Sequence, residues 1–318
     1  MRIVVVGEGM LELSRAPSTV ATDGGAWRLG HGGDTLNTAI HLARGGDRVA
    51  YLTALGSDPF SDALRADWQA EGLDTALILT DEARLPGLYA IRTDDAGERT
   101  FSYWRGDSAA RQVFALPGAD GALATAQAAD LLVFSLISLA ILPDAGRATL
   151  LALAQRMRDE GRQVAFDGNY RPRLWDDADT ARHWRDRAIA CCTIGLPTLE
   201  DEAAMEGTDA SAADTAARWR AGGAGTVVVK LGADGCLLPD GRTLPPPQRL
   251  RPADTSGAGD AFNAGYLHAL LRGAAPHTAA LAGHRLAGWV VMRAGAVPPR
   301  GTDDPYHRLL DRDGESRP

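Results

Sequence analysis

The sequence predicts an α/β protein with a mainly parallel β-sheet that carries helices on both faces. Short runs rich in β-branched residues alternate with segments of helical periodicity, which is typical of β-α-β units. The chain is 45% hydrophobic and 23% charged, as in ordinary globular proteins, and its 318 residues can hold a large single domain or a core domain with a smaller appendage. One pair of alternating runs breaks this rhythm and predicts a small second sheet.

The strands of the main sheet are expected where short apolar runs end in small or polar residues. Such runs suit parallel strands, because helices cover both faces of a parallel sheet. The expected strands are residues 3–6, 49–55, 131–135, 164–167, 193–196 and 226–231.

Two helices are expected early in the chain. The first covers residues 35–44 and is stopped by Gly45 and Gly46, and the second begins after Asp58 and ends at Gly72. Apolar residues three and four apart indicate their inward faces. These are Leu36, Ala39, Ile40 and Ala43 in the first helix, and Phe60, Leu64 and Trp68 in the second.

The irregular region contains two alternating runs, residues 88–93 and 99–104, joined by the polar segment 94–98. This pattern predicts a β-hairpin, which with residues 11–29 could form a small sheet outside the main one. A protruding sheet can act as a lid that excludes water, although composition alone also fits an ordinary surface hairpin. The expected division is a core of residues 1–10, 31–84 and 108–300, a lid of residues 11–30 and 85–107, and a loosely ordered polar tail of residues 301–318.

Composition excludes several classes of function. The formal net charge of −8 argues against nucleic acid as the main partner, because phosphate backbones recruit basic surfaces. The N-terminal apolar run is too short for a signal peptide, and no stretch approaches the length of a membrane span. Cys191, Cys192 and Cys236 show neither disulfide nor metal-site spacing, so reduced thiols in a cytoplasmic protein are expected.

The segment most informative about chemistry is residues 254–266, DTSGAGDAFNAGY. A loop rich in small residues leads into an apolar helix, and a helix N-terminus binds anions through its unpaired N–H groups. Gly257 and Gly259 would let the backbone approach a phosphoryl group. Asp260 falls in the first turn, where its carboxylate could accept a proton from an alcohol. A capped helix with an acidic first turn fits the same residues.

Two motifs resemble a known family. Residues 254–266 match the C-terminal signature of the PfkB (ribokinase-like) carbohydrate kinases. Residues 32–39, GGDTLNTA, resemble its N-terminal signature, although Thr35 departs from the general pattern. The GGDTLN version is similar to that of the 2-keto-3-deoxygluconate kinases within the family. The similarity extends from residue 3 to about residue 300 and includes Gly7-Glu8, Glu12-Leu13 and the segments 53–56, 86–89, 97–101, 103–105 and 169–175.

The resemblance implies a Rossmann-like core with a small β-sheet lid, ATP at the carboxyl ends of the strands, and the sugar beneath the lid. It implies Asp260 as the catalytic base, with Gly257, Ala258 and Gly259 as an anion hole. The substrate side implied by the family is Gly33, Asp34, Asn37, Tyr89, Tyr103, Arg105 and Arg171. The nucleotide side is Asn169, Arg171, Lys230, Gly232, Ala233, Asp234 and Gly235, although the last four also fit a plain strand end with a β-turn.

Magnesium binding is the least well defined part of this comparison. The family often has an Asn-x-x-Glu motif near the phosphates, whereas residues 197–202 here read PTLEDE, without the asparagine. Glu202 is the expected acidic residue for Mg²⁺, with Asp201 nearly as good. Because Mg²⁺ binds mainly through nucleotide phosphates and water, loss of one outer group need not abolish its use.

The expected activity is ATP-dependent phosphorylation of 2-keto-3-deoxygluconate at its 6-hydroxyl, with a fructokinase or ribokinase as the alternative. A sugar acid needs a partner for its carboxylate, and arginine offers two parallel donors. Arg105 and Tyr103 would share one face of a lid strand, with Trp104 packed on the other. An NAD-dependent oxidoreductase fits poorly, since Gly7-Glu8-Gly9 lacks the full glycine-rich turn. A homo-oligomer is possible.

Overall fold

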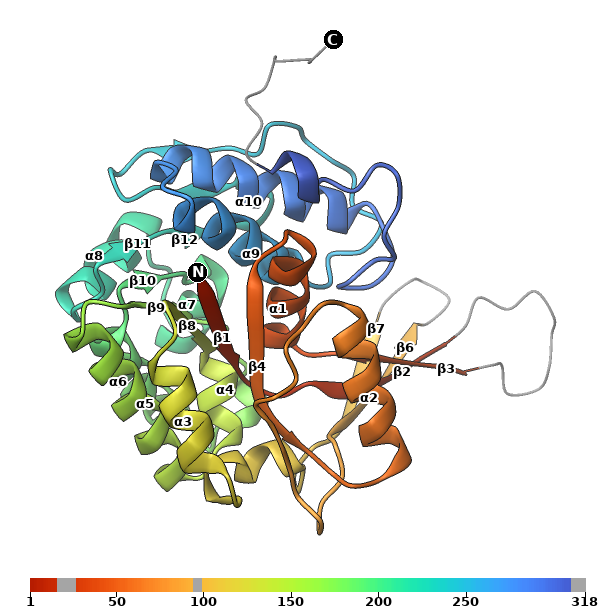
Figure 1. Ribbon diagram of the computed structural model, residues 1–318. Coiled ribbons are helices and arrows are strands. Elements are labelled where there is room, and N and C mark those ends of the chain that lie inside the picture. Colours follow the sequence, from red (N-terminus) through yellow and green to blue (C-terminus); the bar gives the residue numbers. More distant parts are fainter. Residues whose placement is uncertain (16–26, 94–98, 310–318) are drawn as a thin grey trace.

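The computed structural model describes residues 1–15, 27–93 and 99–309. Within these residues the main sheet has seven strands in the order β11-β10-β9-β8-β1-β4-β5, and every neighbouring pair is parallel (Figure 1). The predicted fold class is therefore confirmed. The strands are β1 (Arg2–Val6), β4 (Arg48–Leu55), β5 (Ile78–Thr80), β8 (Leu131–Ser135), β9 (Gln163–Asp167), β10 (Ile194–Gly195) and β11 (Thr226–Val227).

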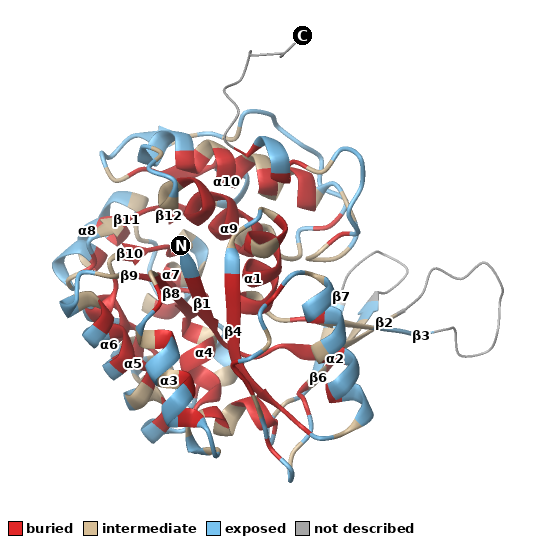
Figure 2. Ribbon diagram, viewed as in Figure 1, coloured by how far each residue is buried: buried red, intermediate tan, exposed pale blue. Residues whose placement is uncertain are grey.

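Helices cover both faces of this sheet, and each face has its own apolar core (Figure 2). Along β1 the side chains alternate, so Val4 and Val6 join one core while Ile3 and Val5 join the other. The first core is covered by α3 (Ala119–Gln127), α4 (Leu136–Ile141), α5 (Asp144–Asp159), α6 (Ala178–Cys191), α7 (Leu199–Glu206) and α8 (Ala212–Ala221). The second is covered by α1 (Asp34–Arg44), α2 (Pro59–Ala70), α9 (Ala258–Leu271) and α10 (Pro276–Val291).

A second sheet of four strands protrudes beside α2 (Figure 1), in the order β3-β2-β6-β7. Its register places Glu12, Tyr89 and Tyr103 side by side on one face. Trp104 lies on the opposite face and is 60% exposed, so the expected packing of Trp104 is wrong. Residues 94–98, the expected connection of the hairpin, lie outside the described residues. The strands are β2 (Met10–Arg15), β3 (Trp27–Gly32), β6 (Leu88–Thr93) and β7 (Arg99–Trp104).

The structure differs from the sequence prediction at two further places. The expected strand 226–231 divides, and β12 (Val229–Lys230) joins β13 (Cys236–Leu237) and β14 (Thr243–Leu244) in a small antiparallel sheet. Phe60 is 53% exposed rather than inward, because Ser61, Leu64 and Trp68 form the buried face of α2. The Ser61 hydroxyl accepts from the Gly56 N–H, which explains why a polar residue takes that place.

Short 3₁₀ segments complete the fold at Ala109–Ala115, Pro172–Leu174, Gly232–Asp234 and Tyr306–Arg308. All three cysteines are buried and free. No helix within the described residues has the length and apolar character needed to cross a membrane.

The C-terminal segment packs on the core, in contrast to the expectation for residues 301–318. Tyr306 and Leu309 are buried, at 3% and 2% exposed, while residues 310–318 lie outside the described residues. The Tyr306 hydroxyl lies 2.8 Å from Nδ1 of His41 and 3.4 Å from Nη1 of Arg44, both on α1. Burial lowers the pKa of His41 to about 4, so this imidazole is neutral at pH 7. Two apolar anchors in a polar segment are enough to hold it down.

We expect Tyr306→Ala to lower the free energy of unfolding by about 3 kcal/mol, because it empties a buried aromatic site. Tyr306→Phe keeps the ring and should cost only about 1 kcal/mol, the usual contribution of a hydrogen bond. Chemical denaturation of the three proteins measures both values. Equal stability of all three would show that the segment is loosely attached.

Candidate active site

A cleft of about 2230 Å³ lies between the second sheet and the carboxyl ends of the core strands. Strands β4 and β5 lie on one side of β1, and β8 to β11 lie on the other, so the strand order has a switch point between β1 and β8. Open α/β sheets hold ligands at such a point. The volume exceeds the usual 300–1,000 Å³ of a small-molecule pocket, so the cleft has room for more than one small molecule. The lining includes Glu12, Tyr89, Tyr103 and Arg105 from the second sheet and its edge, Asp167, Asp201 and Lys230 from the core, and residues 254–260 and 293–299.

Asp260 lies in the first turn of α9, at the bottom of this cleft. Nδ2 of Asn37 donates to its carboxylate at 2.9 Å, and the Thr38 hydroxyl donates to its carbonyl oxygen at 3.3 Å. Burial and the nearby charge of Asp34 raise the pKa of Asp260 to about 8, although the bond from Asn37 opposes the shift. A carboxyl group with this pKa can exchange a proton near neutral pH, as a general base requires.

The N-terminus of α9 is open toward the cleft. Gly257 is the N-cap residue with φ 69°, a left-handed conformation that favours glycine, and no side chain caps the helix. A Cβ at Gly259 would meet a single neighbour within 4 Å, Nζ of Lys230 at 3.6 Å. The first turn therefore presents backbone N–H groups beside a lysine, an arrangement suited to a phosphoryl group.

Lys230 is held in place by a residue that the sequence prediction missed. Its Nζ donates to Oδ1 of Asp167 at 2.9 Å, and Nδ2 of Asn263 donates to Oδ2 of the same carboxylate at 2.7 Å. Asp167 is the last residue of β9, and its charge also contributes to the raised pKa of Asp260. A carboxylate at the carboxyl end of an expected parallel strand was the signal available in the sequence.

The expected substrate-side residues come together around Asp260. Gly33, Asp34 and Asn37 at the start of α1 line the cleft, and Nδ2 of Asn169 donates to Asp34 at 3.0 Å. Tyr89 donates its hydroxyl to Glu12, and the rings of Tyr89 and Tyr103 lie 5.9 Å apart.

Arg105 and Arg171 are among the arginines that line the cleft, and each is paired with a carboxylate. Nε of Arg105 donates to Oε2 of Glu8 at 2.7 Å. Nη1 of Arg171 donates to Asp201 at 3.2 Å, and the Arg171 side chain is 52% exposed. The Glu8 contact was not expected from the sequence.

The turn after β12 only partly meets the expectation for the nucleotide side. Lys230 and Gly232 line the cleft, whereas Ala233, Asp234 and Gly235 are absent from its lining. Gly235 instead closes the turn into β13, with φ 100° and its N–H donating to the Gly232 carbonyl. For these three residues the β-turn interpretation fits better.

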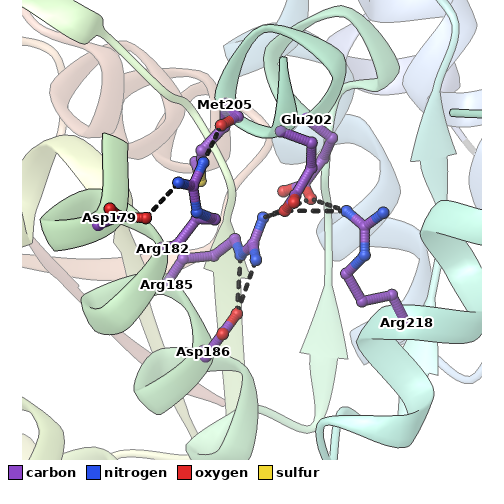
Figure 3. A network of polar contacts seen from close by, with 8 residues as sticks. Asp179, Arg182, Arg185, Asp186, Glu202, Met205 and Arg218 are labelled. Atoms are coloured by element: carbon purple, nitrogen blue, oxygen red, sulfur yellow. Dashed lines mark hydrogen bonds and ion pairs between the residues drawn. The ribbon is translucent and has the colours of Figure 1, made fainter. Parts of the chain in front are cut away.

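Glu202 does not face the cleft, so the expectation that it supports Mg²⁺ is wrong. It is fully buried, and its Oε2 lies 3.1 Å from Nη1 of Arg185 and 3.5 Å from Nη1 of Arg218, between α6 and α8 (Figure 3). Consecutive helix residues point about 100° apart, and it is Asp201 that lines the cleft. Burial raises the pKa of Asp201 to about 6, which a nearby cation would counteract.

A parallel core, a protruding second sheet and a buried aspartate at an open helix N-terminus define the class of carbohydrate kinases. The chain matches the pfkB family of carbohydrate kinases over residues 1–302, and it belongs to this family.

Several known proteins resemble the chain along most of its length. The 2-dehydro-3-deoxygluconokinase of Escherichia coli (strain K12) is 42% identical over 311 residues, covering 94% of this chain and 97% of the relative. A fructokinase of Klebsiella pneumoniae is 30% identical over 253 residues and covers 77% of each chain.

Solved structures share the fold. The 2-dehydro-3-deoxygluconokinase of Thermotoga maritima superposes with a TM-score of 0.81 at 20% identity, covering 93% of this chain and 95% of that one. The aminoimidazole riboside kinase of Salmonella enterica, in complex with aminoimidazole riboside and an ATP analogue, superposes with a TM-score of 0.78 at 23% identity, covering 98% and 100%.

The raised pKa of Asp260 predicts a pH-dependent cost in stability. Its folded pKa of about 8 exceeds the ordinary value of 3.8, so the folded state keeps a proton that the unfolded state loses. Wild-type stability from this group is therefore fully present below about pH 4 and declines as pH rises toward 8. Asp260→Asn removes the titration. Its stability relative to wild type should rise between pH 4 and pH 8 by at least about 1 kcal/mol.

Denaturant unfolding of both proteins across this pH range provides the measurement. Parallel stability profiles would mean that Asp260 titrates in its ordinary range.

Proposed function

We propose that the protein transfers the γ-phosphoryl group of ATP to the 6-hydroxyl of 2-keto-3-deoxygluconate, giving the 6-phospho product. The observation that carries this proposal is the placement of Asp260 between two sets of groups. Lys230 and the α9 N-terminus lie on one side, and Tyr89, Tyr103 and Arg105 line the same cleft from the second sheet. The 42% identity to the E. coli 2-dehydro-3-deoxygluconokinase over 94% of the chain supports the same substrate.

Asp260 acts as the general base. With its carboxylate ionised, it accepts the proton of the sugar hydroxyl as that oxygen attacks the phosphoryl group. Asn37 donates to one carboxylate oxygen and so fixes the orientation of the other. The backbone N–H groups of Gly257, Ala258 and Gly259 stabilise the charge on the transferring group, as an anion hole does.

The sugar binds toward the second sheet. Its hydroxyl and keto oxygens contact Gly33, Asp34 and Asn37. The second sheet encloses it with Tyr89 and Tyr103. Arg105 pairs with the carboxylate of the sugar acid. A neutral sugar has no group for this arginine to pair with. A fructokinase or ribokinase activity is the alternative, but the fructokinase relative is less similar, at 30% identity over 77% of the chain.

The nucleotide binds toward the other side, near Asn169, Arg171, Lys230 and Gly232. Asp201 is suited to support Mg²⁺, because it is a carboxylate that lines the cleft. Burial raises its pKa to about 6, and a bound cation would favour its ionised form. Mg²⁺ typically needs one or two carboxylates besides the nucleotide phosphates, and when bound it neutralises phosphate charge. Asp201 takes the part that the sequence suggested for Glu202.

The experiment that tests this function is a coupled ATP-consumption assay with 2-keto-3-deoxygluconate, fructose and ribose. The sugar acid should give the highest kcat/KM. Asp260→Asn, which keeps the shape but cannot take the proton, should lower kcat by about 10²–10⁴-fold while ATP binding persists. A variant that retains more than half of the wild-type kcat, with chemistry rate-limiting, would exclude Asp260 as the base.

The anion hole is tested by Gly259→Val. Its branched side chain would project toward Lys230 Nζ and occupy the space proposed for the phosphoryl group. We expect kcat to fall at least about 100-fold, the scale for losing one oxyanion-hole donor, with a small change in sugar KM. The parameters should be compared on protein whose thermal unfolding matches that of Gly259→Ala. An unchanged kcat would show that this loop only caps the helix and does not bind the phosphoryl group.

A further inference from the structure

The Gly7-Glu8-Gly9 segment after β1 carries a buried charge that the proposed mechanism does not use. Glu8 is 2% exposed, although glutamate is rarely buried unless it is paired. Its Oε1 is buried without a hydrogen-bond partner among the described residues, which is unfavourable for stability. A Cβ at Gly87 would lie 2.6 Å from this oxygen, so glycine there leaves room for the carboxylate. Two separate segments thus accommodate Glu8.

Glu8 engages one edge of the Arg105 guanidinium. Its Oε2 accepts from Nε at 2.7 Å and also pairs with Nη2. A guanidinium has a second edge, formed by its two terminal nitrogens, which can bind a carboxylate through two parallel bonds. Nη1 has no partner among the described residues, and Arg105 lines the cleft. The contacts with Glu8 use Nε and one N–H of Nη2, so Nη1 and the second N–H of Nη2 remain for a planar anion.

The Arg105 side chain is held by a residue from another part of the chain, Glu8. Arg105 follows the last residue of β7, whose neighbour Trp104 is 60% exposed, so solvent lies close by. The Arg105 side chain is nevertheless only 10% exposed, because the buried Glu8 holds it inward. A long side chain fixed before the substrate arrives loses less entropy on binding.

We propose that Glu8 is a positioning residue that sets substrate specificity. It fixes the Arg105 guanidinium so that its terminal edge receives the carboxylate of a sugar acid. This inference rests on the proposed function, since it needs an acidic substrate. A plain charge-neutralising role makes the opposite prediction, because removing Glu8 would then strengthen binding of an anion.

The test compares wild type, Glu8→Gln, Glu8→Leu, Arg105→Ala and the Glu8→Leu/Arg105→Ala double variant. Each is assayed with 2-keto-3-deoxygluconate and with its neutral analogue, in which the carboxylate is reduced to an alcohol. Glu8→Leu should raise KM for the acid roughly 10-fold or more, the scale of hydrogen bonds to a charged group. Glu8→Gln keeps an acceptor and should show a smaller rise. The kcat/KM for the analogue should change less than about 3-fold.

The double variant should be no worse than Arg105→Ala with the acid, because Glu8 acts through that arginine. Glu202→Gln is the matched control. Glu202 is also a fully buried glutamate paired with arginine and has one unpartnered oxygen, but it lies outside the cleft lining. It should lower the melting temperature without changing the ratio of kcat/KM between acid and analogue.

Equal losses for acid and analogue, additive losses with Arg105→Ala, or a lower KM for the acid in either Glu8 variant would overturn the inference. If Glu8→Leu does not fold, Glu8→Gln with Arg105→Ala decides by the same criteria. A wild type that prefers the neutral analogue would overturn the proposed substrate, and the inference with it. A wild type that prefers the acid while Glu8 variants lose both substrates equally would overturn the inference alone.

Discussion

The hydrogen bond from Asn37 to Asp260 joins residues 223 positions apart and brings the two halves of the site together. Helix α1 follows β3 of the second sheet, and α9 begins at Ala258 after its N-cap residue Gly257. The contact between these helices therefore sets the distance from the second sheet to the N-terminus of α9. The bond from Thr38 to the Asp260 carbonyl fixes the same contact through the backbone. The rest of the site is built outward from this pair.

Charge in the cleft is arranged as held pairs. Asp167 holds Lys230, Glu8 holds Arg105 and Asp201 pairs with Arg171, so these three cations are paired before any ligand binds. The Asp260 carboxylate, like that of Asp34, receives a bond from an amide instead, and Asp260 is buried. Fixed cations suit anionic substrates, while the buried Asp260 carboxyl keeps a proton affinity useful for catalysis. A negative overall charge of −8 is compatible with this, since local geometry dominates inside a cleft.

Much of the fold was predictable because buried parallel strands appear as continuous apolar runs, as in β1 and β8. The hairpin and the start of α9 were also readable, since alternation and glycine placement are local signals. Contacts between distant segments could not be predicted from the sequence. The sequence does not show that Glu8 meets Arg105 or that Asp167 meets Lys230, because both depend on strand order. The sequence prediction preferred Glu202 to Asp201. Without the asparagine of the Asn-x-x-Glu motif the position of the acidic residue is not fixed, and a shift of one residue along a helix turns the side chain to another face. Tyr306 looked like part of a polar tail because two anchors give no periodic pattern.

The packing of the C-terminal segment on α1 has a consequence for biosynthesis. Arg44 on α1 binds Glu71, the Pro298 carbonyl and Tyr306, so the same arginine contacts early and late parts of the chain. Residues emerge from the ribosome in order, and α1 is therefore complete long before its partners α9 and Tyr306 exist. Until then the apolar face of α1 that α9 will cover remains without its cover, and exposed apolar surface of this kind makes an incomplete chain prone to aggregation. Asn37 meets Asp260 only when most of the chain has been made.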